Sequence, residues 1–144
     1  MSQFRRLSET MLASPQITVA DVAAAKELGV TLIVNNRPEG ESDDQTPGAE
    51  IEAAARAAGI DYLAIPVGHS GFSHPQVVRL AEAIGGSGGT VLGYCRSGTR
   101  STLLWALARS NMGDDPEALA AAAAQAGYNV APVRPAMDAL AAAR

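Results

Sequence analysis

The chain has 144 residues, of which 47 % are hydrophobic and 18 % are charged, and its formal net charge is -4. This length suits one compact domain, and the composition excludes a disordered chain. The acidic balance argues against nucleic acid as a partner, the single cysteine excludes an internal disulfide, and no apolar run is long enough to cross a bilayer. We therefore expect a single-domain protein of the cytoplasm, away from nucleic acid and membrane.

Helix signals and short apolar runs alternate along the chain. Thr18 followed by Asp21 has the spacing of a helix capping box, and so does Ser73 followed by Gln76. Short continuous apolar runs predict buried strands, whereas polar stretches with Gly or Pro predict loops. In chain order the predicted elements are a weakly indicated strand within 11–17, a helix at 18–29, a strand at 30–34, a loop at 38–44, a helix with Pro47 at its first position that ends at Gly59, a strand at 60–67, a loop at 68–72, a helix at 73–84, a glycine-rich turn at 85–89, a strand at 90–94, a helix after 100, a helix at 115–127 and a short helix at 136–144.

Strands that alternate with helices predict an α/β fold, with a parallel β-sheet flanked by helices on both faces. In such sheets, ligands bind beyond the carboxyl ends of the strands. Asn36, Arg37, His69 and Cys95 all follow predicted strands closely. We therefore expect these four side chains at the edge of the sheet where a ligand would bind.

The segment CRSGTR at 95–100 connects the last predicted strand to a helix. A tight loop with Gly98 at its bend, followed by a helix N-terminus, directs successive backbone N–H groups at one point and attracts an anion. Arg100 adds a planar charged fork suited to an oxyanion. Cys95 lies at the mouth of this loop, where the amides, the helix dipole and the arginine charge favour its thiolate form.

A single cysteine at the end of a buried strand is more often an inert apolar side chain than a nucleophile. Here two arginines, a glycine and two hydroxyl side chains follow within six residues, which favours a reactive thiolate. Ser101 can donate a hydrogen bond to the sulfur or assist a leaving group, and Arg96 is expected to face solvent or substrate. Asn36 and Arg37 fit two roles equally well, because they can bind the distal part of a substrate or satisfy strand-end carbonyls. The candidate catalytic residues are Cys95, Arg100, Ser101 and His69, and the candidate binding residues are Arg96, Ser97, Gly98, Thr99, Asn36 and Arg37.

Four segments resemble a known family: FRRLSETMLASPQIT at 4–18, VNNRPEGE at 34–41, YLAIPV at 62–67 and YCRSGTRSTLLWALA at 94–108. They are similar to the phosphatase-like domain of the beta-lactamase hydrolase-like protein family over about 4–112, with 113–144 as a C-terminal helical extension. The resemblance implies a fold similar to dual-specificity and tyrosine phosphatases, in which a loop cysteine attacks phosphorus and a loop arginine holds the phosphoryl oxygens. It makes Cys95 the nucleophile, Arg100 the clamp and Ser101 the hydroxyl that follows it.

Two features depart from the phosphatase pattern. The loop holds four residues between Cys95 and Arg100, one fewer than phosphatase loops. In this length it is similar to the loop of single-domain rhodaneses. The smaller ring of the rhodanese loop suits sulfur transfer through a persulfide. In addition, His69 stands where dual-specificity phosphatases carry a general-acid aspartate, and an imidazolium can donate a proton to a leaving alkoxide.

Three functions therefore stay open. The chain is a cysteine-dependent, phosphatase-like hydrolase with a covalent intermediate on Cys95, which we favour. Alternatively, it is a rhodanese-like sulfurtransferase that carries a Cys95 persulfide from thiosulfate or a persulfide donor, or a non-catalytic module that binds an anion. Each of these three functions implies a small anionic substrate or ligand as the partner and requires no metal or cofactor. The sequence leaves the oligomeric state open.

Overall fold

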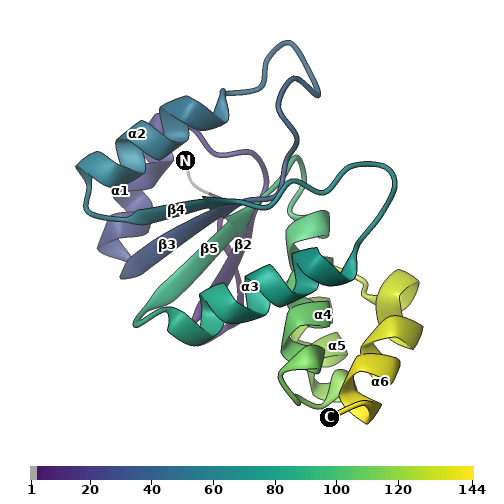
Figure 1. Cartoon of the computed structure of the whole chain (residues 1–144). Coiled ribbons are helices and arrows are strands. Elements are labelled where there is room, and N and C mark those ends of the chain that lie inside the picture. The colour runs from purple at the N-terminus through teal and green to yellow at the C-terminus, as the bar shows by residue number, and fades with distance from the viewer. Residues whose placement is uncertain (1–2) are drawn as a thin grey trace.

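The computed structural model describes residues 3–144, which form a five-stranded sheet in the order β1-β2-β5-β3-β4 with helices around it (Figure 1). The strands are β1 (Arg5–Ser8), β2 (Met11–Ser14), β3 (Val30–Asn35), β4 (Asp61–Ala64) and β5 (Thr90–Tyr94). The helices are α1 (Val19–Glu27), α2 (Gly48–Ala57), α3 (His74–Gly86), α4 (Thr99–Asn111), α5 (Pro116–Gln125), the 3-10 turn η1 (Ala131–Val133) and α6 (Arg134–Ala142). The predicted α/β fold is thus confirmed.

The sheet is mostly parallel, because β2 pairs with β5, β5 with β3 and β3 with β4 in the same direction. The edge strand β1, which the sequence does not predict, runs antiparallel to β2. The sequence RRLS of β1 carries no apolar run, since Arg5 and Arg6 are exposed and only Leu7 is buried. A polar edge strand of this kind gives no strand signal of its own.

Two hydrophobic cores fill the two faces of the sheet. Helices α1 and α2 cover one face, whereas α3 and α4 cover the other, and α5 and α6 pack against α4 (Figure 1). Side chains along β5 alternate between these faces, so that Val91 joins the core of α3–α6 and Leu92 joins the core of α1 and α2. The central helix α4 is buried around most of its circumference, and Trp105 is a core residue, as predicted.

Local capping signals set the helix starts. The backbone N–H of Thr18 donates to the Asp21 carboxylate at 2.8 Å, and that of Ser73 donates to Gln76 Oε1 at 2.8 Å, so both predicted capping boxes are confirmed. Helix α2 differs from the prediction, because Pro47 precedes the helix instead of forming its first turn.

The reason for this shift at α2 lies outside the helix. The N–H of Gly48 donates to the Glu39 carboxylate at 2.9 Å, and that bond satisfies one of the free donors of the first turn. A side chain at position 48 would collide with Glu39, so the glycine permits this close approach.

The strands β3, β4 and β5 all end at one edge of the sheet, near the start of α4 (Figure 1). The predicted strand at 60–67 is shorter in the structure, although its chain continues along β3. The N–H groups of Ile65 and Val67 donate to the carbonyls of Asn35 and Asn36 at 2.9 Å each. These bonds hold the loop after β4 beside the end of β3. Within residues 3–144 no helix combines the length and hydrophobicity that a membrane crossing requires.

Candidate active site

The loop between β5 and α4 encloses the only cysteine of the chain. Cys95 is fully buried, and the backbone N–H of Gly98 donates to its sulfur at 3.1 Å. Gly98 is the N-cap of α4 and has φ = +91°, a left-handed conformation that favours glycine. The sulfur therefore lies inside the turn that leads into α4, close to the positive end of the helix dipole.

Three carbonyls of this loop accept hydrogen bonds, two from distant residues and one from the first turn of α4. They accept hydrogen bonds as follows: Arg96 from the Gln16 N–H at 3.2 Å, Ser97 from the Tyr128 hydroxyl at 3.1 Å, and Gly98 from the Thr102 N–H and hydroxyl at 3.0 and 2.9 Å. In a trans peptide the C=O and N–H groups point in opposite directions. With its carbonyl held by Tyr128, the Ser97–Gly98 peptide directs the Gly98 N–H at the sulfur, whereas the Thr99 N–H donates to the Ser97 hydroxyl at 3.3 Å.

Arg100 forms a bidentate ion pair with Glu41. Its Nη1 and Nη2 donate to the two carboxylate oxygens of Glu41 at 2.7 and 2.8 Å, and Nη1 also donates to the Val67 carbonyl at 2.7 Å. These contacts leave Nε–H and one Nη2–H on the side of the guanidinium that faces neither partner. The hydrogen bond to Glu41 raises the pKa of Arg100 although burial opposes the shift, and the Cys95 sulfur adds a smaller electrostatic contribution in the same direction.

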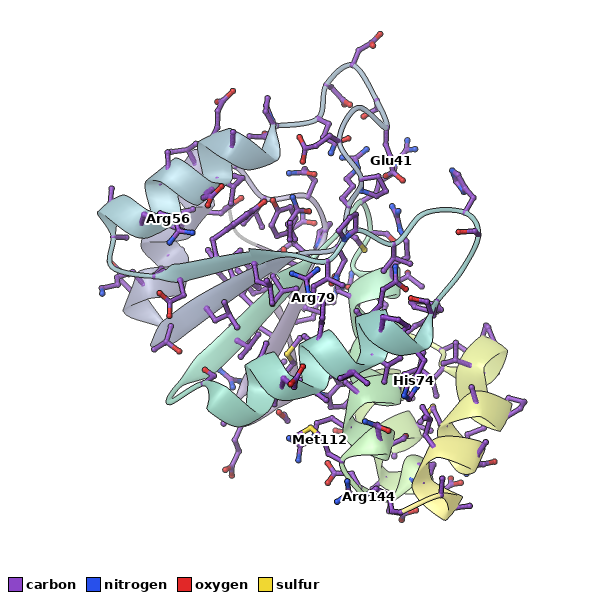
Figure 2. All side chains as sticks on the ribbon, in the orientation of Figure 1. Glu41, Arg56, His74, Arg79, Met112 and Arg144 are labelled. Carbon is purple, nitrogen blue, oxygen red and sulfur yellow. The ribbon has the colours of Figure 1, made fainter. Side chains whose placement is uncertain are left out.

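Glu41 connects two arginines. Its Oε1 accepts from Arg37 Nε at 2.9 Å as well as from Arg100, and these bonds lower the pKa of Glu41 to about 2 although burial opposes the shift. Arg37 is only 4 % exposed and also donates to Gln16 and Ser42 at 3.0 Å. Figure 2 shows Glu41 on the loop between β3 and α2.

The sequence analysis does not single out Glu41, because the acidic segment 38–44 predicts only a surface loop. The four-residue spacing from Arg37 to Glu41 is the signal that indicates a local ion pair. The more distant contact with Arg100 has no local signature.

Asn36 and Ser101 form a second buried pair. The Ser101 hydroxyl donates to Asn36 Oδ1 at 2.8 Å, and Asn36 Nδ2 donates to the Ile65 carbonyl at 2.9 Å. Asn36 thus has the second of its two predicted roles, satisfying a carbonyl beyond a strand end. Ser101 has a single hydroxyl proton, so the predicted hydrogen bond to the sulfur is absent from this arrangement.

The remaining predicted residues are exposed. The hydroxyls of Ser97 and Thr99 contact each other at 3.0 Å on the outer side of the loop. Arg96 lines a hollow of about 340 Å³ that also includes Gln16. His69 lies on the loop after β4 and belongs to none of the buried networks described above.

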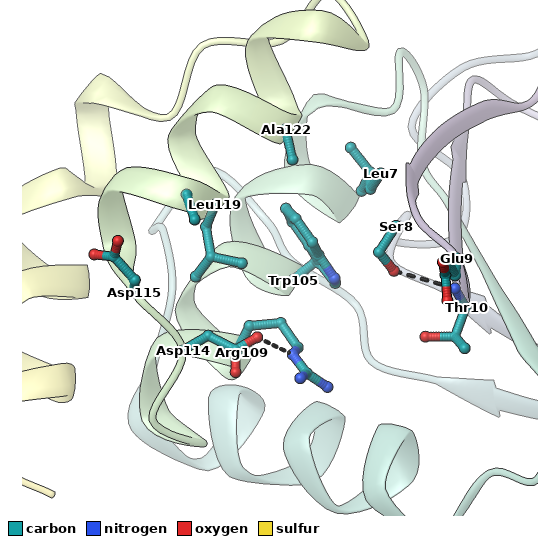
Figure 3. A pocket seen from close by; sticks show the side chains of 11 residues that line it. Leu7, Ser8, Glu9, Thr10, Trp105, Arg109, Asp114, Asp115, Leu119 and Ala122 are labelled. Atoms are coloured by element: carbon teal, nitrogen blue, oxygen red, sulfur yellow. Dashed lines mark hydrogen bonds and ion pairs between the residues drawn. The ribbon is translucent and has the colours of Figure 1, made fainter.

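A larger hollow of about 440 Å³ lies elsewhere and contains no residue of the 95–100 loop. It is lined by the β1–β2 turn, α4 and α5, and its polar wall carries the ion pair between Arg109 and Asp114 at 2.7 Å (Figure 3). The carbonyl of Thr10, in its wall, accepts from the N–H of Val91 at the start of β5. This hollow therefore lies near the amino end of β5, whereas Cys95 follows the carboxyl end of that strand.

The sequence model of the "Beta-lactamase hydrolase-like protein, phosphatase-like domain" matches residues 3–112. The chain belongs to this family. Beta-lactamase hydrolase-like proteins from Xylella fastidiosa and Agrobacterium fabrum are 35 % and 30 % identical to it, over 70 % and 71 % of its length. The chain spans about a quarter of these relatives, 23 % and 24 %.

Solved structures are similar to the chain over more than nine-tenths of its length. A phosphatase candidate from Neisseria meningitidis is 32 % identical, with a TM-score of 0.81 over 94 % of this chain and 96 % of that one. Another phosphatase candidate, from Shewanella putrefaciens, shares the fold at 21 % identity, with a TM-score of 0.76 over 99 % of this chain and 93 % of that one. Pseudomonas aeruginosa TpbA, solved with phosphotyrosine, shares it at 20 % identity, with a TM-score of 0.67 over 97 % and 88 %. The chain thus has the fold of cysteine-based phosphatases.

Proposed function

We propose that this family member is a cysteine-dependent phosphatase that hydrolyses small phosphoesters through a covalent intermediate on Cys95. The observation that carries the proposal is the pairing of one buried sulfur with two kinds of donor. The Gly98 N–H donates to the sulfur at 3.1 Å, and the Arg100 guanidinium, in the first turn of α4, interacts with it electrostatically. Together these donors stabilise the anionic phosphoryl group while it is transferred to and from the sulfur.

The reaction takes place in two displacements. The Cys95 thiolate attacks phosphorus, the bond to the leaving oxygen breaks, and that oxygen takes a proton. Water then attacks the phosphocysteine, so that inorganic phosphate leaves and the thiolate returns. Loop N–H groups and Arg100 stabilise the charge on the phosphoryl oxygens in both steps. Two phosphatase structures, including one with phosphotyrosine, support a phosphoester as the substrate class.

Glu41 acts in this proposal as a positioning residue. Its carboxylate holds the end of the Arg100 guanidinium, which leaves the Nε side of the fork to face the oxyanion. Arg37 also pairs with Glu41, so the two arginines and the one carboxylate together carry one net positive charge. That excess charge attracts an anionic substrate.

Sulfur transfer is the second candidate, favoured by the four residues between Cys95 and Arg100. One comparison separates the two activities. Wild-type protein and Cys95→Ser are assayed with an aryl phosphate and, in parallel, with thiosulfate and cyanide. Phosphate release that is lost in the variant supports the proposal, whereas thiocyanate formation lost in the variant supports sulfur transfer. Wild-type protein that binds phosphate but is inactive in both assays contradicts both enzymatic functions and supports the non-catalytic anion-binding module.

His69 is proposed as the general acid that protonates the leaving oxygen. The second histidine of the chain, His74, gives a matched control, since it is also exposed and lies at the start of α3, well apart from Glu41 (Figure 2). We expect His69→Ala to slow release of a poor alkoxide leaving group at least roughly 100-fold and to spare a good leaving group, while His74→Ala changes neither. Equal rates for wild type and His69→Ala with the poor leaving group remove His69 from the mechanism.

A further inference from the structure

Tyr128 connects the C-terminal extension to the cysteine loop. It follows α5 and lies beyond the residues that the family model matches, yet its hydroxyl donates to the Ser97 carbonyl at 3.1 Å. Its ring is buried and is covered by the guanidinium of Arg5, whose carbon lies 5.2 Å from the ring centre. Arg5 also donates to the Ala126 carbonyl at 3.1 Å, and this bond fixes its guanidinium over the ring.

The bond from Tyr128 acts on a peptide unit that also contacts the sulfur. The Ser97 carbonyl and the Gly98 N–H belong to one peptide group and point in opposite directions. Tyr128 holds the carbonyl at 3.1 Å on one side, and Cys95 Sγ accepts from the N–H at 3.1 Å on the other. A flip of this peptide would break both bonds and would point a carbonyl oxygen at the thiolate.

The residue at this bend does not by itself prevent such a flip. Glycine adopts positive and negative φ with similar ease, so Gly98 permits the observed turn but also permits others. A side chain at position 98 would overlap the Tyr128 hydroxyl, which shows how closely Tyr128 packs on the bend. The orientation therefore depends on an outside hold, and Tyr128 supplies it on the carbonyl of the critical peptide.

We propose that Tyr128 is a positioning residue that keeps the Gly98 N–H directed at Cys95 and at a bound tetrahedral oxyanion. The C-terminal extension thereby forms part of the active site through one hydroxyl. The inference rests on the proposed function for the identity of the anion, whereas the effect on the thiol is independent of any turnover.

Tyr128→Phe tests this inference, since it removes only the hydroxyl and keeps the ring under Arg5. Cys95 is the only thiol and is fully buried, so its alkylation rate depends on access as well as on ionisation. The ratio of the rate with iodoacetamide at about pH 6 to the plateau rate at high pH removes the access factor and reports the thiolate fraction. We expect this alkylation ratio to fall roughly 10-fold and the dissociation constant for tungstate to rise roughly 10-fold, which corresponds to the loss of about one hydrogen bond to an anion. A variant that alkylates and binds tungstate like wild type overturns the inference.

Tyr62→Phe is the matched control. Its hydroxyl is part-buried and accepts from Asn35 Nδ2 at 2.9 Å, so this variant also loses one tyrosine hydrogen bond. We expect both variants to lose similar thermal stability, with thiol alkylation and tungstate binding impaired only in Tyr128→Phe. Equal losses in the two variants contradict a positioning role. A wild type without phosphatase activity contradicts the proposed function instead, since neither readout requires turnover.

Discussion

At the scale of single residues, the site depends on how charge is paired. The carboxylate of Glu41 is largely buried between Arg37 and Arg100, with only 15 % of its side chain exposed. Removing one partner from such a buried network leaves uncompensated charge and costs more than the loss of an exposed pair. Glu41 therefore supports both the fold of the 38–44 loop and the orientation of Arg100.

The titration of Glu41 predicts a stability difference that depends on pH. Its pKa is about 2 in the folded chain against an ordinary value of 4.5, so the ion pairs contribute fully above the ordinary value and are lost as pH falls toward 2. We expect Glu41→Gln to lower the free energy of urea unfolding by roughly 2 to 3 kcal/mol at neutral pH, and by much less near pH 2. We also expect kcat/KM for an aryl phosphate to fall about 10-fold, because Arg100 loses its support.

Glu52→Gln serves as the control for charge removal. Glu52 pairs with Arg56 at 2.8 Å on the exposed surface of α2, where such pairs contribute about 0.5 kcal/mol or less. Its unfolding free energy and activity should stay near those of wild type. Wild-type and Glu41→Gln proteins with parallel unfolding free energies from neutral pH to about 2 would contradict the role of Glu41.

At the scale of elements, the helix starts that rest on neighbouring residues were predictable. The pairs Thr18 with Asp21 and Ser73 with Gln76 are three residues apart, so the pattern is visible in the sequence itself. The start of α2 was misplaced, because its N-terminal N–H bonds to Glu39, nine residues earlier. Strand β1 was missed for a similar reason. Its polar sequence has no apolar pattern typical of a strand, and it is held in the sheet by its pairing with β2.

The C-terminal helices belong to the core of the domain and do not form a separate appendage. Met137 of α6 is fully buried in the cluster that also contains Leu104 and Trp105 of α4. Met137→Ala should therefore lower the free energy of unfolding by about 2 to 5 kcal/mol, measured by urea denaturation.

Met112 is the comparison for this test, since it follows α4 and is only part-buried. Met112→Ala should cost under about 1 kcal/mol. If Met137→Ala proves as mild as Met112→Ala, the extension is only loosely attached, and its role in holding the cysteine loop loses its support.

At the scale of the whole molecule, the fold brings distant segments to one edge of the sheet. The cysteine loop itself was predictable, because a strand, a glycine bend and a helix start are contiguous in the sequence from 90 to 108. Its supports were not, since Glu41 lies 59 residues from Arg100 and Tyr128 lies 31 residues from Ser97. Such contacts follow from the order of strands in the sheet and from the packing of α5 and α6 on α4, which no local pattern encodes.

The central claim is that Cys95 carries the phosphoryl group during turnover. Wild-type protein is mixed with an aryl phosphate, quenched in acid within the first turnovers and digested, and the peptides are weighed by mass spectrometry. We expect the peptide that contains Cys95 to gain the mass of one phosphoryl group, and Cys95→Ser to show neither this adduct nor phosphate release. Phosphate release at an undiminished rate from Cys95→Ser, with no adduct on wild-type Cys95, would contradict the account.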